Sequence, residues 1–285
     1  MIARLDADVL VLGDVDWDAG GAAAAALRDR LAAMGLRYPH HVARRPNAGR
    51  PSGADLDGDG RRGGARDALG YGRFTGDGGL LVLSRLPLGP VADHTAVEWD
   101  AGALVPPGVA LPVPTVAQWA VPLAGTDVVL VTLAAGTPVF DGPEDRNGRR
   151  NAAELALAHR LARDALAAGL RPVLAGRANV DPVDGAGRRG AMRALLRDPA
   201  FRDPRPRGEG GGGDGHRGDP ALDTAAWAGP GPLRVDYVLP AAALVVAASG
   251  VLWPAADDPF RLVVETAGPG RAIWADIEIG PVPLP

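Results

Sequence analysis

The feature that most constrains the fold is a long polar loop between a buried strand and a helix. Residues 127–133 form an apolar run, DVVLVTL, that is typical of a strand covered on both faces. Residues 152–170 have the periodicity of a helix that closes at a glycine. The loop at residues 137–151 is rich in Pro, Gly, Asn, Asp and Arg. Ligands bind at the C-terminal ends of strands in α/β sheets, so we expect a functional loop here, with a solvated surface loop as the alternative.

The rest of the chain also alternates short strands with helices. Its 285 residues are 47% hydrophobic, which is enough for one large α/β domain over residues 1–285. Residues 89–118 predict a long surface excursion, and residues 203–220 predict a glycine-rich loop in which His216 is solvated. Further expected strands are residues 9–12, 79–83, 118–123, 172–175 and 233–240, and further expected helices are residues 22–34 and 187–197.

The composition excludes several classes of function. The 30 basic and 34 acidic residues give a formal charge of −4, which argues against a protein devoted to wrapping nucleic acid. The chain has no Cys, which excludes disulfides, thiolate metal sites and thiol nucleophiles. No apolar stretch approaches the roughly eighteen residues of a membrane helix, and the N-terminus lacks the pattern of a signal peptide. The sequence as written therefore predicts a cytoplasmic protein without membrane contact.

The long loop also carries a family resemblance. Its segment FDGPEDRNGRRN, residues 140–151, resembles a signature of one bacterial branch of the endonuclease/exonuclease/phosphatase superfamily, and segments from residue 8 to residue 254 agree with it in order. The resemblance implies a four-layer α/β/β/α sandwich of two mixed sheets, like pancreatic deoxyribonuclease, and metal-dependent phosphoester hydrolysis. Family members begin with a strand and a helix before the segment that matches Asp8. Only a helix end precedes Asp8 here, which implies either a misassigned start codon or a missing N-terminal edge strand.

Two positions keep a residue that the resemblance assigns to the catalytic centre, and a third has a shorter acidic residue. Asn179 matches the asparagine that holds the phosphate, and Asp236 matches the aspartate that orients the terminal catalytic histidine. Asp14 stands where the family has a metal-ligating glutamate. Because Asp is shorter by one methylene, the carboxylate would fall about 1.5 Å short, and only a weak divalent site is expected at Asp14.

Five other positions differ from the residues that the resemblance implies. Gln118 and Ala134 stand where the family has histidines, and Arg177 replaces the aspartate that orients or deprotonates the attacking water. Pro269 and Gly270 replace the last Asp-His pair. None of these side chains can transfer a proton near neutral pH. The sequence therefore predicts a divergent member of the family whose hydrolytic site is largely lost.

A separate acidic run predicts a structural calcium site. Carboxylates at Asp55, Asp57 and Asp59 are followed by a glycine, which repeats the start of a calcium loop. Asp67 lies one residue beyond the position of the usual bidentate glutamate. We expect these four residues to bind Ca²⁺ within an insertion at residues 50–70, with a plain acidic turn as the alternative.

Three functions remain open from the sequence. In the preferred one, the cleft binds a phosphate-bearing small molecule, a nucleic acid or a protein partner without turnover. In the second, Mg²⁺ or Mn²⁺ at a rebuilt aspartate site supports an active phosphodiesterase or nuclease. The third is a calcium-stabilised structural or interaction module. The phosphate contacts expected are Arg149, Arg177 and Asn179, with Arg146, Arg150, Arg234 and Arg271 as further candidates against ordinary salt bridges, and the rebuilt site would use Asp14, Asp16, Asp181, Asp184 and Asp236.

Overall fold

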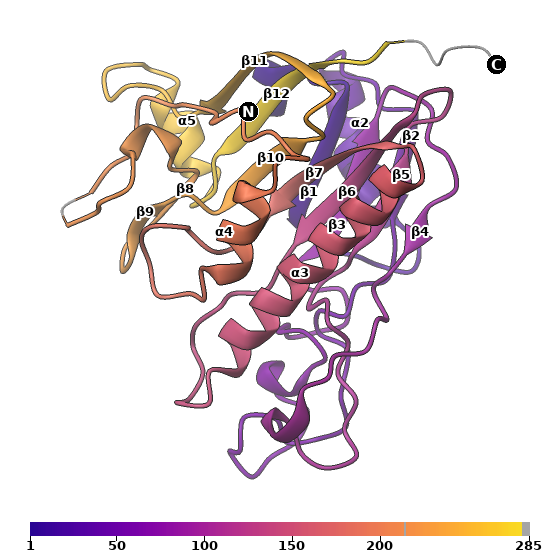
Figure 1. The fold of residues 1–285 in the computed structure, drawn as a ribbon, viewed down its shortest axis with the longest axis vertical. Coiled ribbons are helices and arrows are strands. Elements are labelled where there is room, and N and C mark those ends of the chain that lie inside the picture. Colours follow the sequence, from indigo (N-terminus) through magenta and orange to yellow (C-terminus); the bar gives the residue numbers. More distant parts are fainter. Residues whose placement is uncertain (214, 281–285) are drawn as a thin grey trace.

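The centre of the molecule is a pair of β-sheets that face each other, with helices on their outer faces (Figure 1). The computed structural model describes residues 1–213 and 215–280. The first sheet is antiparallel, with the order β1-β3-β2. Its strands are the apolar segments β1 (Val9–Val15), β3 (Gly79–Ser84) and β2 (His40–Ala43).

The second sheet is mixed and has the order β10-β7-β6-β5-β4. Its central strands β6 (Val128–Ala134) and β7 (Arg171–Arg177) are parallel, as expected for strands joined by a helix. The other strands pair antiparallel: β5 (Trp119–Pro122), β4 (Ala92–Asp93) and β10 (Asp236–Pro240).

Three apolar layers hold this arrangement together. Helix α2 (Ala22–Ala33) packs Leu31 against Leu83 on the outer face of the first sheet. Helices α3 (Arg146–Ala167) and α4 (Gly190–Arg197) cover the outer face of the second sheet. Between the sheets, Val82 packs near the fully buried Trp119. The α/β/β/α layering expected from the sequence is confirmed.

Smaller strands complete the fold. Two further sheets have two strands each: β11 (Val245–Leu252) pairs with β12 (Ala272–Glu278), and β8 (Ala225–Trp227) pairs with β9 (Gly231–Leu233). The described strands therefore form four sheets, whereas the sequence predicted two. Among the described residues, β1 pairs only with β3, and β12 pairs only with β11. The remaining helices are α1 (Ile2–Leu5) before β1 and α5 (Arg261–Thr266) before β12. No helix in the described ranges is both long and apolar enough to span a bilayer.

Two segments differ from the sequence prediction. Helix α3 begins at Arg146, six residues before the expected start, because polar residues of the signature form its first turns. Residues 89–118 are not all on the surface, since Leu111, Val113 and Ala117 are buried. Polar side chains bind the backbone of this segment, including Asn47, whose Nδ2 donates to the carbonyl groups of residues 95 and 114 at 2.7 and 2.8 Å. Apolar periodicity cannot reveal such a segment, because its stability depends on contacts from distant residues.

Candidate functional site

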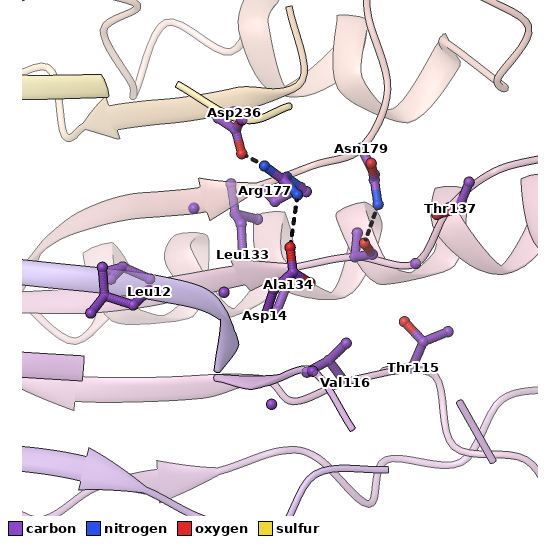
Figure 2. A pocket seen from close by; sticks show the side chains of 18 of the residues that line it. Leu12, Asp14, Thr115, Val116, Leu133, Ala134, Thr137, Arg177, Asn179 and Asp236 are labelled. Carbon is purple, nitrogen blue, oxygen red and sulfur yellow. Dashed lines mark hydrogen bonds and ion pairs between the residues drawn. The ribbon is translucent and has the colours of Figure 1, made fainter. Parts of the chain in front are cut away.

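A large cleft of about 1670 Å³ opens where the C-terminal ends of β1, β6 and β7 lie near the start of β10. Figure 2 shows Asp14, Ala134, Arg177, Asn179 and Asp236 pointing into this region from their separate segments. Asp14 and Asn179 both have left-handed backbone conformations, with φ of 57° and 59°. Such conformations are uncommon for residues other than glycine and cluster at functional sites. The cleft is therefore the candidate functional site.

Arg177 occupies the centre of the site and bridges two carboxylates. Strands β7 and β10 place Arg177 directly opposite Asp236. The Nε of Arg177 donates to Oδ1 of Asp236 at 2.9 Å, and its Nη1 donates to Oδ2 of Asp14 at 3.1 Å (Figure 2). The side chain of Asp236 is 12% exposed, whereas that of Asp14 is 81% exposed. The stronger of the two interactions is thus expected to be the buried one with Asp236.

Burial and ion pairing act in opposite directions on these groups. Burial raises the pKa of the Asp236 carboxyl above its ordinary value, although the charge of Arg177 lowers it. Burial lowers the pKa of the Arg177 guanidinium, but Asp236 and Asp14 outweigh this effect, and the net pKa is raised. Arg177 therefore remains a cation, and it supplies positive charge between the carboxylates of Asp14 and Asp236.

Gly270 makes room for this guanidinium. A Cβ added at Gly270 would lie 2.6 Å from Nη2 of Arg177, which is too close for any real contact. Pro269 and Gly270 line the cleft beside Arg177, as does Ala134 at the end of β6. Gln118 does not line the cleft: it is buried, and its Nε2 donates to the carbonyl of Thr132 at 2.7 Å. The resemblance placed Gln118 at the site, but the structure turns this side chain into the core.

No imidazole is available at the cleft. None of the five histidines of the chain is among its lining residues, and all five lie in the described ranges. His159 interacts with Asp198 at 2.6 Å, beneath helix α4. His216 lies 3.1 Å from the carbonyl of Pro230 and is partly exposed in the glycine-rich loop. General acid-base catalysis by histidine therefore has no residue to perform it in this cleft.

The aspartates of the expected rebuilt site do not converge. Of the five, only Asp14 and Asp236 line the cleft. Asp181 is buried, and its oxygens accept the backbone N–H groups of residues 183, 184 and 234 at 2.7 to 2.8 Å. Asp184 accepts the N–H groups of residues 217 and 218, and Asp16 accepts the N–H group of Gly78. These three carboxylates fasten loops together, and the predicted five-aspartate metal site is not assembled.

Several arginines that the sequence offered as phosphate contacts have structural partners instead. Arg150 is buried and donates to the carbonyl groups of residues 112, 113 and 114, and burial lowers the pKa of its guanidinium to about 10. Arg234 is 8% exposed and pairs with Asp203 at 2.6 Å. Arg149 is exposed outside the cleft lining. Arg271 lines the cleft, but its Nη1 donates to the carbonyl of Gly268 at 2.7 Å. Arg177 and Arg146 are the candidate contacts that line the cleft without being buried, although Nη1 of Arg146 also donates to the carbonyl of Leu56.

Two polar residues near the start of helix α3 hold the backbone around the cleft: Asn151, the last residue of the signature, and Glu154, three residues after it. Glu154, which sequence reasoning missed, is buried and accepts the N–H groups of Thr115 and Gly136 at 2.6 and 2.8 Å. Asn151 donates from Nδ2 to the carbonyl groups of Gly136 and Ala178 at 2.8 and 2.9 Å. The sequence signal that could have identified Glu154 was its spacing of three residues from Asn151, which places two polar side chains on one face of a helix. Their hydrogen bonds fix the loop after β6 against helix α3.

The acidic run at residues 55–59 gathers its carboxylates in one place. Atoms from Asp55, Asp57 and Asp59 lie within 4.8 Å of one another. Asp67 does not belong to this group. It is buried, and its two oxygens accept the N–H groups of Leu56 and Gly64 at 2.8 and 2.9 Å. Asp67 therefore closes the loop, and three of the four predicted calcium ligands remain together.

Comparisons with known proteins agree with the observed fold. The sequence model described as Endonuclease/Exonuclease/phosphatase family matches residues 1–274. A search of curated proteins found no match. Among solved structures, the chain is similar to an endonuclease/exonuclease/phosphatase from Beutenbergia cavernae, with 21% identity, a TM-score of 0.62 and coverage of 98% of this chain. The chain spans 64% of the length of that protein.

Two further structures are similar over most of both chains. A 3′ phosphatase, NExo, from Neisseria, bound to a product DNA hairpin, has 18% identity and a TM-score of 0.56, with 97% of this chain and 91% of that chain covered. A family protein from Leptotrichia buccalis has 14% identity and a TM-score of 0.53, with coverage of 97% and 89%. At these identities, the similarity establishes a common fold.

Proposed function

Because the chain belongs to the endonuclease/exonuclease/phosphatase family, which is generally dependent on divalent metals, we propose that it is a non-hydrolytic member whose cleft binds a phosphate-bearing ligand. The observation that carries this proposal is the position of Arg177 between Asp14 and Asp236. The guanidinium of Arg177 forms ion pairs with both carboxylates, and a metal ion in the same position would need these carboxylates as ligands.

The residues present do not fit a catalytic divalent cation. Mg²⁺ requires carboxylate oxygens at about 2.0–2.1 Å in near-octahedral geometry. To bind one, Asp14 and Asp236 would have to release Arg177, whose position directly opposite Asp236 keeps the guanidinium close to the ion. Repulsion between the two cations at this distance opposes binding. With Arg177 between the two carboxylates and no histidine among the described residues that line the cleft, we infer that this centre supplies neither a metal-activated water nor an imidazole to protonate a leaving group.

The same arrangement supports binding of a phosphate. Arg177 uses Nε and Nη1 for its carboxylates, while its Nη2 makes no hydrogen bond among the described residues. Nη2 is a cationic donor in the cleft, and charge-assisted hydrogen bonds from arginine to phosphate are strong. Asn179 lies nearby, with its Nδ2 3.1 Å from the carbonyl oxygen of Ala135. Arg146 supplies a second cation on the cleft wall.

Turnover and binding assays on the full chain test this proposal. A generic phosphodiester, a phosphomonoester and a single-stranded oligonucleotide are incubated with Mg²⁺, Mn²⁺ or Ca²⁺, and we expect no hydrolysis. We expect the oligonucleotide to bind, and Arg177→Ala to weaken binding by about tenfold, the effect of one charge-assisted contact. Arg149→Ala, outside the cleft, is the matched control and should bind normally. Hydrolysis that disappears in both Asp14→Ala and Asp236→Ala would overturn the proposal and support an active enzyme.

A second candidate role concerns the loop at residues 50–70. The gathered carboxylates of Asp55, Asp57 and Asp59 favour a structural Ca²⁺ site, because Ca²⁺ prefers several flexible oxygen ligands. Such a site would stiffen a loop that borders the cleft at Leu56 and Asp57. It would contribute to stability and not to the chemistry of the cleft.

A further inference from the structure

Two aromatic side chains project from the mouth of the cleft into solvent. Phe140 is 79% exposed and Tyr71 is 69% exposed, and both are among the residues that line the cleft. Phe74, near Tyr71 in the chain, is 50% exposed. An exposed phenylalanine forgoes the roughly 1.5–3 kcal/mol that burial of its ring would provide. Large apolar side chains gathered in this way usually mark a binding surface.

The backbone at Phe140, whose ring is exposed, has a strained conformation. Its φ is 70°, in the left-handed region that side chains other than those of Gly, Asn and Asp rarely adopt. Asn147 holds both neighbours: its Nδ2 donates to the carbonyl of Val139 at 2.9 Å, and its N–H donates to the carboxylate of Asp141. Strain that the surroundings impose in this way is typical of a ligand-binding position.

The segment that carries Tyr71 and Phe74 is fastened as well. The N–H of Gly49 donates to the carbonyl of Gly70 at 2.9 Å, and the N–H of Gly76 donates to the carbonyl of Ala48 at 3.0 Å. Gly49 has a φ of 69° and lies so close to the carbonyl of Phe74 that an added Cβ would approach its oxygen to 1.7 Å. A fixed backbone with exposed rings is a preformed surface, which lowers the entropy cost of binding.

Arginines line the same cleft as the aromatic rings. Arg66, Arg73 and Arg146 line it together with Tyr71 and Phe140. Arg66 is exposed, and Arg73 is 78% exposed even though it pairs with Asp77 at 3.3 Å. A cleft lined by both exposed rings and cations is suited to a strand of phosphates with unstacked bases. A protein partner would instead favour an interface centre depleted of charged residues, whereas these three arginines line the cleft.

We propose that Phe140 and Tyr71 are stacking surfaces for unpaired nucleobases, so that the ligand of this cleft is single-stranded nucleic acid. This inference rests on the proposed function, which supplies the phosphate contact at Arg177. Stacking on an aromatic ring accepts any base, and binding should therefore be tolerant of sequence. Paired bases in a duplex are already stacked and cannot occupy these rings.

Three probes of equal length, of which the two single strands also have equal charge, separate the contribution of the bases from that of the phosphates. Fluorescence anisotropy with the full chain compares an oligothymidylate strand, an abasic strand with the same phosphates, and a duplex. We expect the oligothymidylate to bind at least about tenfold more tightly than the other two. Phe140→Ala and Tyr71→Ala should each remove roughly tenfold of that affinity and leave binding of the abasic strand unchanged. Leu262→Ala, which alters a 68% exposed side chain outside the cleft, is the matched control.

The backbone of residue 140 provides a readout that a merely structural role would not produce. Phe140→Gly relieves the left-handed strain, so it should leave the melting temperature unchanged or raise it while it weakens binding of oligothymidylate as much as Phe140→Ala does. Phe140→Trp should retain binding. Equal binding of the abasic strand and oligothymidylate would overturn the stacking proposal alone. Absence of binding to all three probes would overturn it together with the phosphate proposal, whereas hydrolysis that depends on Asp14 would overturn only the proposal of a non-hydrolytic cleft.

Discussion

Replacement of Arg177 by methionine should destabilise the protein through Asp236. The substitution keeps the length of the side chain but leaves the carboxylate of Asp236, which is 12% exposed, without its cation. Removal of one partner from a buried pair costs about 3 kcal/mol at the lower end of the usual range. Asp14 is 81% exposed and should add almost nothing to this cost. At about 2 °C per kcal/mol for a chain of this size, the melting temperature should fall by roughly 6 °C at neutral pH.

The loss should depend on pH, and its direction follows from the pKa of Asp236. Burial already raises this pKa in the folded protein, and removal of the Arg177 charge raises it further above the unfolded value. The folded state then binds more protons than the unfolded state, so stability is present below the unfolded pKa and is lost as the pH rises through the folded pKa. The deficit of Arg177→Met relative to the wild type should therefore be largest near pH 7 and shrink toward pH ~4.

Urea denaturation of the two proteins between these pH values measures the effect. The double variant Arg177→Met/Asp236→Asn should recover most of the lost stability and remove its dependence on pH. Arg207→Met breaks an exposed pair with Asp219, and it is the control that should leave stability nearly unchanged. A deficit that stays constant with pH, or that persists in the double variant, would refute the assignment of the loss to an unpaired Asp236.

Three further predictions follow from the structure. Gly270→Ala should displace the Arg177 guanidinium and cost about 1 kcal/mol by urea denaturation, with weaker binding of an oligonucleotide, because the terminal atoms in the way are mobile; unchanged binding would contradict this. Ca²⁺ should raise the melting temperature of the wild type but not of Asp57→Ala, whereas Asp67→Asn should lower stability with or without Ca²⁺. Burial raises the pKa of Asp223 to about 6, so the contribution of Asp223 to stability should be lost as the pH rises from ~4 through 6, and Asp223→Asn should become more stable relative to the wild type over that range in a pH series of denaturation curves.

The sequence predicted the layers of this fold because most of its strands are short apolar runs. Residues 79–83, for example, lie within β3, which is buried along its whole length. It did not predict the start of helix α3, because Arg150 and Asn151 look like loop residues unless their partners on distant segments are known. The sequence around Arg150 and Asn151 does not show which distant backbone groups these side chains bind in the folded protein.

The candidate site was predicted in position but not in arrangement. The sequence placed Asn179 and Asp236 at the ends of strands, and the structure brings both to the cleft. It offered Arg177 only as a phosphate contact, whereas the register of β7 against β10 makes Arg177 the partner of Asp236. The rebuilt metal site was wrong because Asp181 uses both oxygens for backbone N–H groups, which a list of carboxylates cannot reveal.

The hydrogen bonds of Asn151 and Glu154 have a consequence for how relatives should be recognised. These side chains secure the framework around the cleft and take no part in chemistry at its centre. Selection on folding alone would preserve them after catalysis had disappeared. A protein that shares this segment is thereby shown to share an architecture, and its ability to cleave a phosphoester has to be decided from the residues at the ends of its strands.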